Sequence, residues 1–224
     1  TQQNTILMVV KKISNTGTLN NDNKKYILSG CSSSFTIFNT VDNIVKLNSL
    51  YANSKTLKDL NLNISVGNVV WNQCKKLLTD DKKNTRLIYN SDIKENKLSK
   101  SKFSNSEKKH FIKGKKGSTD IILVLNRGYG NGAYNFNYCL IDEKDPYLIE
   151  NHLICINSIV KNKQIKNCKD KKETEEIRKS LKDQYKKIIK SLKDDKTKQF
   201  ISLYFGNNAV NTTELLNILP IYGL

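Results

Sequence analysis

The sequence lacks several features that identify common classes of protein. No apolar run approaches the length of a membrane-spanning helix, and no signal peptide opens the chain. The five cysteines are odd in number, and no pair has metal-ligand spacing. We therefore expect a cytoplasmic protein from a reducing compartment, without membrane contact, in which Cys139 and Cys155 are small buried residues. The start at Thr1, without methionine, indicates a truncated or processed chain.

Acidic residues are few relative to basic ones. The 224 residues include 38 basic and 21 acidic side chains, a formal net charge of +17. Lysine dominates, because Arg86, Arg127 and Arg178 are the only arginines, and 29 asparagines indicate an AT-rich genome. Codon bias alone does not explain the charge, since aspartate and glutamate also have AT-rich codons. The balance favours binding to a polyanion through phosphate contacts that weaken as salt rises.

The spacing of apolar residues predicts an α+β fold: a mainly antiparallel sheet, a long amphipathic helix and short flanking helices. Alternation or continuous apolar runs predict strands over residues 64–66, 119–126, 134–141 and 152–159. Helical spacing predicts helices over residues 41–60, 169–195 and 212–219. The longest has an apolar stripe of Ile177, Leu181, Tyr185, Ile188 and Leu192.

The only tryptophan lies in the most informative stretch of the chain. Trp71 follows a short apolar run and precedes two side-chain amides, Asn72 and Gln73, with Lys75 and Lys76 close behind. DNA-reading surfaces need cations that contact phosphates, and amides or aromatic rings that contact base edges. Asn and Gln can bond adenine at two positions. We predict that these five residues contact DNA; the alternative is that Trp71 is a core residue with its indole N–H satisfied.

A second segment combines Arg127, Tyr129 and Asn131 with three glycines. Arginine can bond guanine at two positions, and glycine lets the backbone approach a phosphate closely. We predict that these three residues contact DNA. The alternative is a tight turn in which Arg127 caps carbonyls or pairs with Asp142. Gly67, before the tryptophan, permits a sharp turn or a close backbone approach.

Lysines supply the remaining predicted phosphate contacts. Residues 94–116 carry nine lysines against two glutamates, which indicates a mobile basic loop or a phosphate-contacting edge. From this region we select Lys113, Lys115 and Lys116 as DNA-binding residues. The basic residues of 161–198 number 15 against seven acidic ones, and we interpret them most simply as a solvated helix face. The alternative is that this helix contacts phosphates along the DNA.

Three segments, in this order, carry a resemblance to a known family: residues 66–93, 127–138 and 147–153. They resemble the C-terminal target-recognition region of adenine-specific DNA methyltransferases, of the gamma-type and Eco57I-like enzymes of restriction–modification systems, including those of large DNA viruses. Residues 205–215 also look like that family. The resemblance runs from about Thr1 to Leu224, with residues 1–13 as a remnant strand of the catalytic domain and 14–224 as the DNA target-recognition domain.

The catalytic motifs of that family are absent from this sequence. The Asn/Asp-Pro-Pro-Tyr/Phe motif that holds the flipped adenine cannot occur, because Pro146 and Pro220 are the only prolines. A Phe-x-Gly-x-Gly turn for S-adenosylmethionine is also missing. The resemblance therefore implies that this chain reads duplex DNA, with no cofactor or catalytic residue of its own. A methyltransferase catalytic domain, in the same or another polypeptide, would supply S-adenosylmethionine and transfer the methyl group.

Two other functions remain open. One is a non-specific nucleic-acid-binding module, in which charge alone determines binding. The other is a metal-dependent nuclease, because Asp92 with Glu107 and Lys109 loosely resembles a carboxylate plus Glu-x-Lys pattern. His152, beside Glu150, also suggests catalysis, but no nucleophile has a recognisable setting near it, so we favour a structural histidine bonded to backbone.

Overall fold

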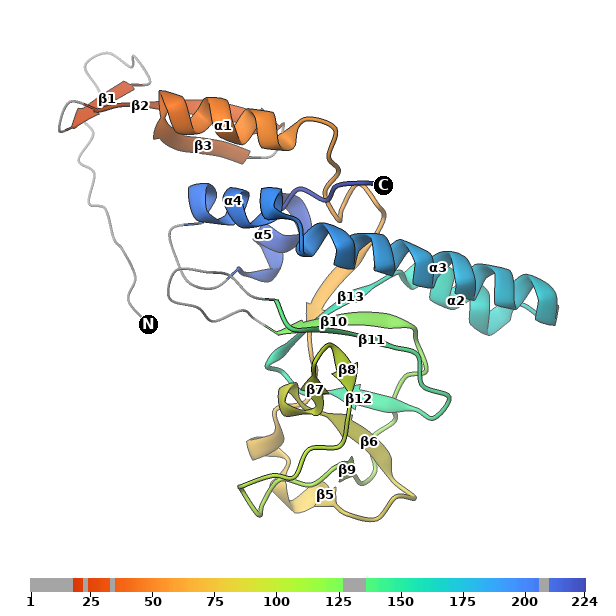
Figure 1. Ribbon diagram of the computed structural model, residues 1–224. Helices are drawn as coiled ribbons and strands as arrows, with labels where there is room; N and C mark the ends of the chain where they lie inside the picture. Colours follow the sequence, from red (N-terminus) through yellow and green to blue (C-terminus); the bar gives the residue numbers. More distant parts are fainter. Residues whose placement is uncertain (1–17, 22–23, 33–34, 127–135, 206–209) are drawn as a thin grey trace.

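The computed structural model describes residues 18–21, 24–32, 35–126, 136–205 and 210–224 (Figure 1). Helices and mainly antiparallel sheets together give an α+β fold, which confirms the predicted fold class.

Four antiparallel strands form a central sheet in the order β11-β10-β13-β4. The strands are β4 (Asn63–Val66), β10 (Ile122–Asn126), β11 (Tyr138–Ile141) and β13 (Leu153–Asn157). Each overlaps one of the four predicted strand regions. The region predicted to end at residue 159 is shorter than expected, because Asn157 is the last strand residue and a helix follows.

The central sheet is covered on both faces. Leu123 and Leu125 of β10 pack into a cluster with the helices, whereas Ile122 and Val124 pack against the strands of a second sheet. All four side chains are buried. This two-sided burial explains why β10 reads as a continuous apolar run rather than an alternating one.

A lower sheet, in the order β12-β6-β9-β5, packs against the central one. Its strands are β5 (Leu78–Thr79), β6 (Thr85–Ile88), β9 (Phe111–Ile112) and β12 (Tyr147–Ile149), and β6 and β12 run parallel. The hairpin of β7 (Ile93–Lys94) and β8 (Lys97–Leu98) lies against β11 of the central sheet. The region predicted as a basic loop or edge therefore contributes β8 and β9.

Helices lie on the other side of the central sheet (Figure 1). They are α1 (Val41–Tyr51), α2 (Ile159–Asn167), α3 (Lys171–Leu192), α4 (Asp195–Tyr204) and α5 (Thr212–Asn217). A third sheet of β1 (Thr18–Asn21), β2 (Lys24–Ser32) and β3 (Phe35–Thr40) packs against α1, at the end of the structure beyond α4 and α5 (Figure 1). One apolar cluster joins α1, α3, α4 and α5 to the central sheet.

Two of the three predicted helices match closely. In α3 the buried side chains include Leu181, Tyr185, Ile188 and Leu192 of the predicted stripe. Asn211 and Glu214 cap α5 reciprocally, as a capping box does.

The helix predicted over residues 41–60 is too long. It ends at Tyr51, and Asn53 adopts a left-handed backbone conformation with φ 57°. The fully buried Leu57 continued the apolar spacing, but it belongs to the turn that follows the helix. Burial alone therefore does not extend a helix past an asparagine in the left-handed region.

Helices α2 and α3 are attached to the start of β10 by buried polar groups. The Tyr185 hydroxyl accepts from the Ser158 N–H at 3.1 Å and donates to the Ile121 carbonyl at 3.2 Å. Asn162 accepts from the Ile121 N–H at 2.8 Å through its oxygen and donates to the same residue's carbonyl at 2.9 Å. The two side chains together satisfy the backbone of Ile121 where the central sheet meets the helices.

Replacing Asn162 by alanine should destabilise the fold, because it leaves the buried N–H of Ile121 without a partner. We expect the free energy of unfolding to fall by about 2 kcal/mol. Urea denaturation of the Asn162→Ala variant measures the change, with Asn167→Ala, an exposed asparagine of the same helix, as the control. Equal stability of the two variants would contradict a structural role for the Asn162 amide.

Candidate functional site

The tryptophan segment is a pair of short 3-10 turns between β4 and β5. Val69, fully buried, pairs with Glu150 and accepts an N–H from Asn151 at 3.0 Å. The first turn, Trp71–Gln73, and the second, Lys75–Leu77, then follow without interruption. This attachment to the β12–β13 turn holds the segment in place relative to the core.

Trp71 lies at the boundary of the core, and its contact with DNA stays a prediction. The indole packs on a small apolar cluster that includes Leu87, Tyr89 and Leu148, so it belongs to the core boundary. The same ring system also lies under two ammonium groups. Lys108 Nζ lies 4.9 Å from the ring centroid and Lys75 Nζ 5.7 Å, within cation–π range.

Lys108 occupies the centre of an aromatic cluster. Its Nζ lies 5.1 Å from the ring centroid of Tyr89 and 6.0 Å from that of Phe103, and it forms no ion pair with any described residue. Tyr89 and Phe103 contact each other edge-on with centroids 4.9 Å apart. Burial, together with the charges of Glu150 and Asp92, raises the pKa of Tyr89, so its hydroxyl stays neutral. A cation is thus held over aromatic rings, where its charge is available to a ligand.

The loop that carries Lys108 is fixed by a buried carboxylate. Asp92 is fully buried and accepts the N–H of Tyr89 and the N–H of Ser101, each at 3.0 Å. Further along, the Lys109 carbonyl accepts the Tyr89 hydroxyl at 3.0 Å. These bonds hold both ends of the basic segment between β8 and β9 in place.

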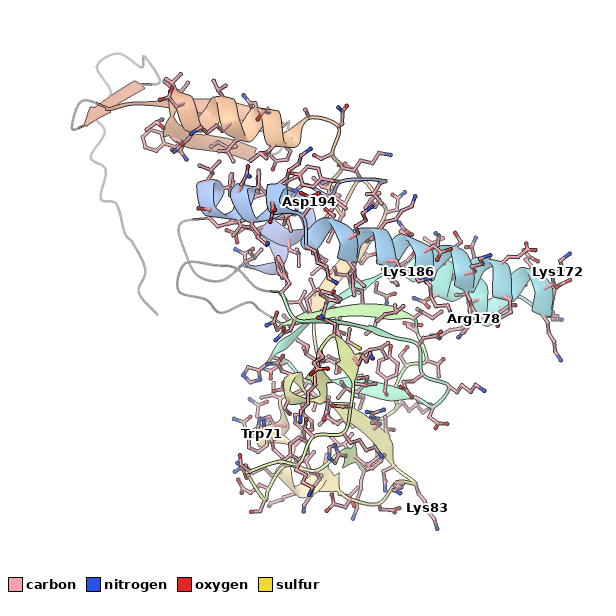
Figure 2. The ribbon with its side chains drawn as sticks, viewed as in Figure 1. Trp71, Lys83, Lys172, Arg178, Lys186 and Asp194 are labelled. Carbon is pink, nitrogen blue, oxygen red and sulfur yellow. The ribbon has the colours of Figure 1, made fainter. Side chains whose placement is uncertain are left out.

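The predicted amides and lysines of the turn are exposed. The side chains of Asn72 and Gln73 form no hydrogen bond to another residue in the described part of the chain. Lys76 is exposed and unpaired within the same part, whereas Lys75 pairs with Glu107 at 2.6 Å. We call Trp71, Asn72, Gln73, Lys75, Lys76 and Lys108 the Trp71 surface; Figure 2 labels Trp71 on the outer side of the lower sheet.

The three predicted lysines after β9 lie in three different places relative to the Trp71 surface. The Lys113 N–H bonds the Leu77 carbonyl at 2.9 Å, so this exposed residue adjoins the second turn. Lys115 is half-buried, and its carbonyl accepts the Thr85 hydroxyl. Lys116 lines a separate cleft beside Gly67. Only Lys113 therefore lies directly against the Trp71 segment.

Arg127, Tyr129 and Asn131 lie outside the described residues. The topology nevertheless places the residue that precedes them. Strands β10 and β4 both run antiparallel to β13, which lies between them, so they run parallel to each other. Asn126 pairs with Leu153, and Val66 pairs with Ile154. Asn126 and Val66, which lead to the two predicted segments, are therefore at the same end of the central sheet.

Asp142, the alternative partner proposed for Arg127, is already engaged. It binds Arg178 and, at 2.9 Å, Lys182, both on α3. This ion-pair group attaches the basic helix to the end of β11.

His152 is a candidate residue that the sequence interpretation did not select. It was expected to bond backbone; instead its Nδ1 contacts the carboxylate of Glu150, whose side chain is only 2 % exposed. The His152 side chain is 57 % exposed. A partner on Nδ1 fixes the ring orientation and leaves Nε2 facing outward as a hydrogen-bonding group. The neighbouring Glu150 in the sequence was the one signal that could have indicated this arrangement.

The nuclease pattern does not form a metal site. Both carboxylate oxygens of Asp92 accept backbone N–H groups, and Glu107 pairs with Lys75. No group of three or more His, Cys, Asp or Glu side chains within the described ranges has the geometry to hold a metal ion. Of the helices in those ranges, none combines the length and apolar character required to cross a bilayer.

Two cavities adjoin the lower sheet. One, of about 310 Å³, is a cleft lined by β4, β12 and residues 116–120. The other, of about 460 Å³, is lined by four cations and two carboxylates: Lys82, Lys83, Arg86, Lys100, Glu143 and Asp145. The net positive charge of this second lining opposes the sulfonium of S-adenosylmethionine.

The cysteines of the central sheet should be unreactive in the folded protein. Burial raises the pKa of Cys139 to about 11 and that of Cys155 to about 12. Only about 10⁻⁴ of Cys155 is thiolate at pH 8, so we expect iodoacetamide to modify it only after unfolding. Mass mapping of the labelled chain, with and without urea, checks this; labelling of folded Cys155 as fast as that of Cys168 would contradict it.

Comparison with known proteins adds no relative to this geometry. No protein-family model, curated protein or solved structure matches the chain.

Proposed function

We propose that this chain recognises duplex DNA in a sequence-specific way, as the specificity part of a site-specific adenine DNA methyltransferase. The Trp71 surface would contact the DNA. The observation that carries the proposal is the pair of exposed amides, Asn72 and Gln73, held on a fixed turn beside lysines that are positioned by an aromatic cluster. Amides without a protein partner are suited to base edges, and the ammonium groups to phosphates.

The distribution of charge supports this assignment. Residues 71–117 contain 14 basic and five acidic residues, a net charge of +9 within the overall +17. Roughly half of the excess positive charge therefore belongs to the segment that builds the Trp71 surface and the strands beneath it. Such a concentration of positive charge attracts a polyanion to the lower sheet.

The outward-facing ring of His152 adds a third type of contact. Its Nε2 can accept from an exocyclic amine of a base when neutral, or donate to a phosphate when protonated. The turn from Glu150 to His152 pairs with Val69, two residues before Trp71, so the ring and the Trp71 surface belong to one structural unit.

The proposal assigns the chemistry to a partner. A catalytic domain, in the same or another polypeptide, would hold S-adenosylmethionine and the flipped adenine, and this chain would transfer nothing by itself. Loops of a recognition domain can help to hold a duplex from which a base has been extruded.

A selection from random duplexes tests the proposal. At about 0.15 M salt, the chain should enrich a defined sequence and bind it at least roughly 10³-fold more tightly than a scrambled duplex. The variant Asn72→Ala/Gln73→Ala should lose discrimination by about 1–3 kcal/mol per lost bidentate contact while keeping its salt dependence. The matched control is Gln164→Ala/Asn167→Ala, an exposed amide pair on α2. Enrichment of no sequence, or cleavage of the duplex with magnesium, would contradict the proposal.

One observation favours the non-specific alternative. Exposed lysines also occur on α2 and α3, far from the Trp71 surface, and Lys163, Lys179, Lys187 and Lys190 pair with no acidic side chain among the described residues. A module that binds by charge alone would use both faces, would show no sequence preference and would release DNA at moderate salt.

A further inference from the structure

Four cationic side chains line a cavity beside the lower sheet, away from the Trp71 surface. Lys82 and Lys83 come from the β5–β6 loop, Arg86 from β6 and Lys100 from the segment after β8. Glu143 and Asp145 of the β11–β12 turn complete the wall, so the lining carries a net charge of +2. Figure 2 shows Lys83 and Trp71 on opposite sides of the lower sheet, and the cavity shares no lining residue with the Trp71 surface.

Arg86 is poorly partnered for a guanidinium that is largely enclosed. Only 18 % of its side chain is exposed. Its Nη2 donates to the Ser99 carbonyl at 3.5 Å, and its Nη1 lies 3.7 Å from a Glu143 oxygen. Its buried Nε has no hydrogen-bond partner among the described residues. Arginine has five N–H donors, and well-formed pairs with carboxylates have distances of about 2.7–2.9 Å. The protein therefore holds the Arg86 guanidinium in place but does not supply close acceptors for most of its N–H donors.

The lysines around Arg86 are equally unengaged. Lys82, Lys83 and Lys100 are exposed, and none of them forms an ion pair inside the described ranges. Lys100 is positioned by Phe111, whose ring centroid lies 5.2 Å from its Nζ. Phe111 also lines the cavity, so this contact holds one cation at the rim.

We infer that this cavity binds a phosphoryl group, with Arg86 as the bidentate donor and the three lysines as additional cations. A tetrahedral oxyanion with several acceptor oxygens can occupy the donors that Glu143 leaves free, and arginine matches its geometry in a way that lysine does not. A volume of about 460 Å³ exceeds the needs of a single phosphate, so the group can enter with part of a larger molecule attached. This site does not depend on DNA binding by the Trp71 surface.

Titration of the full chain with inorganic pyrophosphate, followed by calorimetry, tests the inference. Wild type should bind, and Lys82→Gln/Lys83→Gln, whose exposed side chains do not support the fold, should bind at least about tenfold more weakly. Arg86→Lys should weaken binding similarly while retaining the charge. The matched control Lys163→Gln/Lys179→Gln should bind like wild type. Equal affinity of all four proteins, or no binding by wild type, would overturn the site.

A competition experiment identifies the source of the phosphoryl group. A site for a DNA backbone phosphate is supported by two results together. A short duplex displaces pyrophosphate, and the Lys82→Gln/Lys83→Gln variant binds that duplex more weakly than wild type does. Retention of pyrophosphate in the presence of bound duplex supports a site for a small phosphorylated molecule. The Trp71 surface is intact in the Lys82→Gln/Lys83→Gln variant. Its sequence preference for DNA therefore tests the Trp71 surface, and its pyrophosphate affinity tests the cavity.

Discussion

Replacing Lys75, Lys76, Lys108 and Lys113 together by glutamine should reduce the affinity for duplex DNA by about 1,000-fold near 0.1 M salt. Each phosphate contact releases counterions and contributes about 0.9 to the slope of log affinity against log salt concentration. Loss of four contacts therefore makes that slope less steep by up to about 3.6. Fluorescence anisotropy of a labelled duplex over a range of salt concentrations measures both quantities.

The control for this variant removes the same charge from another face. Lys163, Lys179, Lys187 and Lys190 are exposed and lie on α2 and α3. Their replacement by glutamine should change affinity far less than the first set. Equal losses for the two variants would mean that net charge alone determines binding, and would favour the non-specific module.

Replacing Gly67 by alanine should destabilise the protein by at least about 3 kcal/mol, because there is no room for a methyl group. A Cβ at this position would lie 2.2 Å from the carbonyl oxygen of Glu150 and 2.6 Å from that of Ile149. These are backbone atoms, so the turn that carries His152 and supports Val69 must move. Chemical denaturation measures the stability, and duplex binding of the folded fraction should fall as well.

Gly114 provides the contrasting control. Its φ is +68°, so alanine there is strained, but no atom lies within 4 Å of the added methyl group. Gly114→Ala should cost only about 1 kcal/mol. A cost for Gly67→Ala no larger than this would show that the Glu150 turn moves easily, and would weaken the view that it holds the site in place.

The parts of the fold that were predictable from the sequence are those in which burial follows a local period. Spacing alone identifies three such features, because each pattern is complete within a short stretch of sequence. They are the apolar stripe of α3, the apolar run of β10 and the capping residues of α5. Gly67 was expected at a sharp turn or a close backbone approach, and the structure shows the close approach to Glu150.

Helix α2 was missed because its burial does not follow hydrophobicity. Its buried side chain is the polar Asn162, while Ile159 and Val160 at its start are 55 % and 61 % exposed. The requirement that fixes Asn162 is the backbone of Ile121, 41 positions earlier. A pattern of apolar spacing over neighbouring residues cannot reveal a hydrogen-bond partner this distant in the sequence.

The sequence shows the residue types of the candidate site but not their arrangement. The amides and lysines of the turn from Trp71 to Lys76 are adjacent in the sequence. Lys108, which lies closest to the indole of the two lysines, is 37 positions away and was not selected. Lys108 lies in the segment between β8 and β9, which Asp92 bonds at Ser101 and the Tyr89 hydroxyl bonds at Lys109. Arg86 likewise acquires its significance from a cavity formed by four separate segments of the chain.

The intrinsic fluorescence of Trp71 tests the central claim most directly, because this is the only tryptophan in the chain and lies within the proposed interface. Titration with the selected duplex should change its emission and reduce its quenching by iodide, with the same midpoint as the anisotropy of the labelled DNA. An emission and quenching profile that stays unchanged while anisotropy shows saturation would place the DNA elsewhere, and would contradict the account.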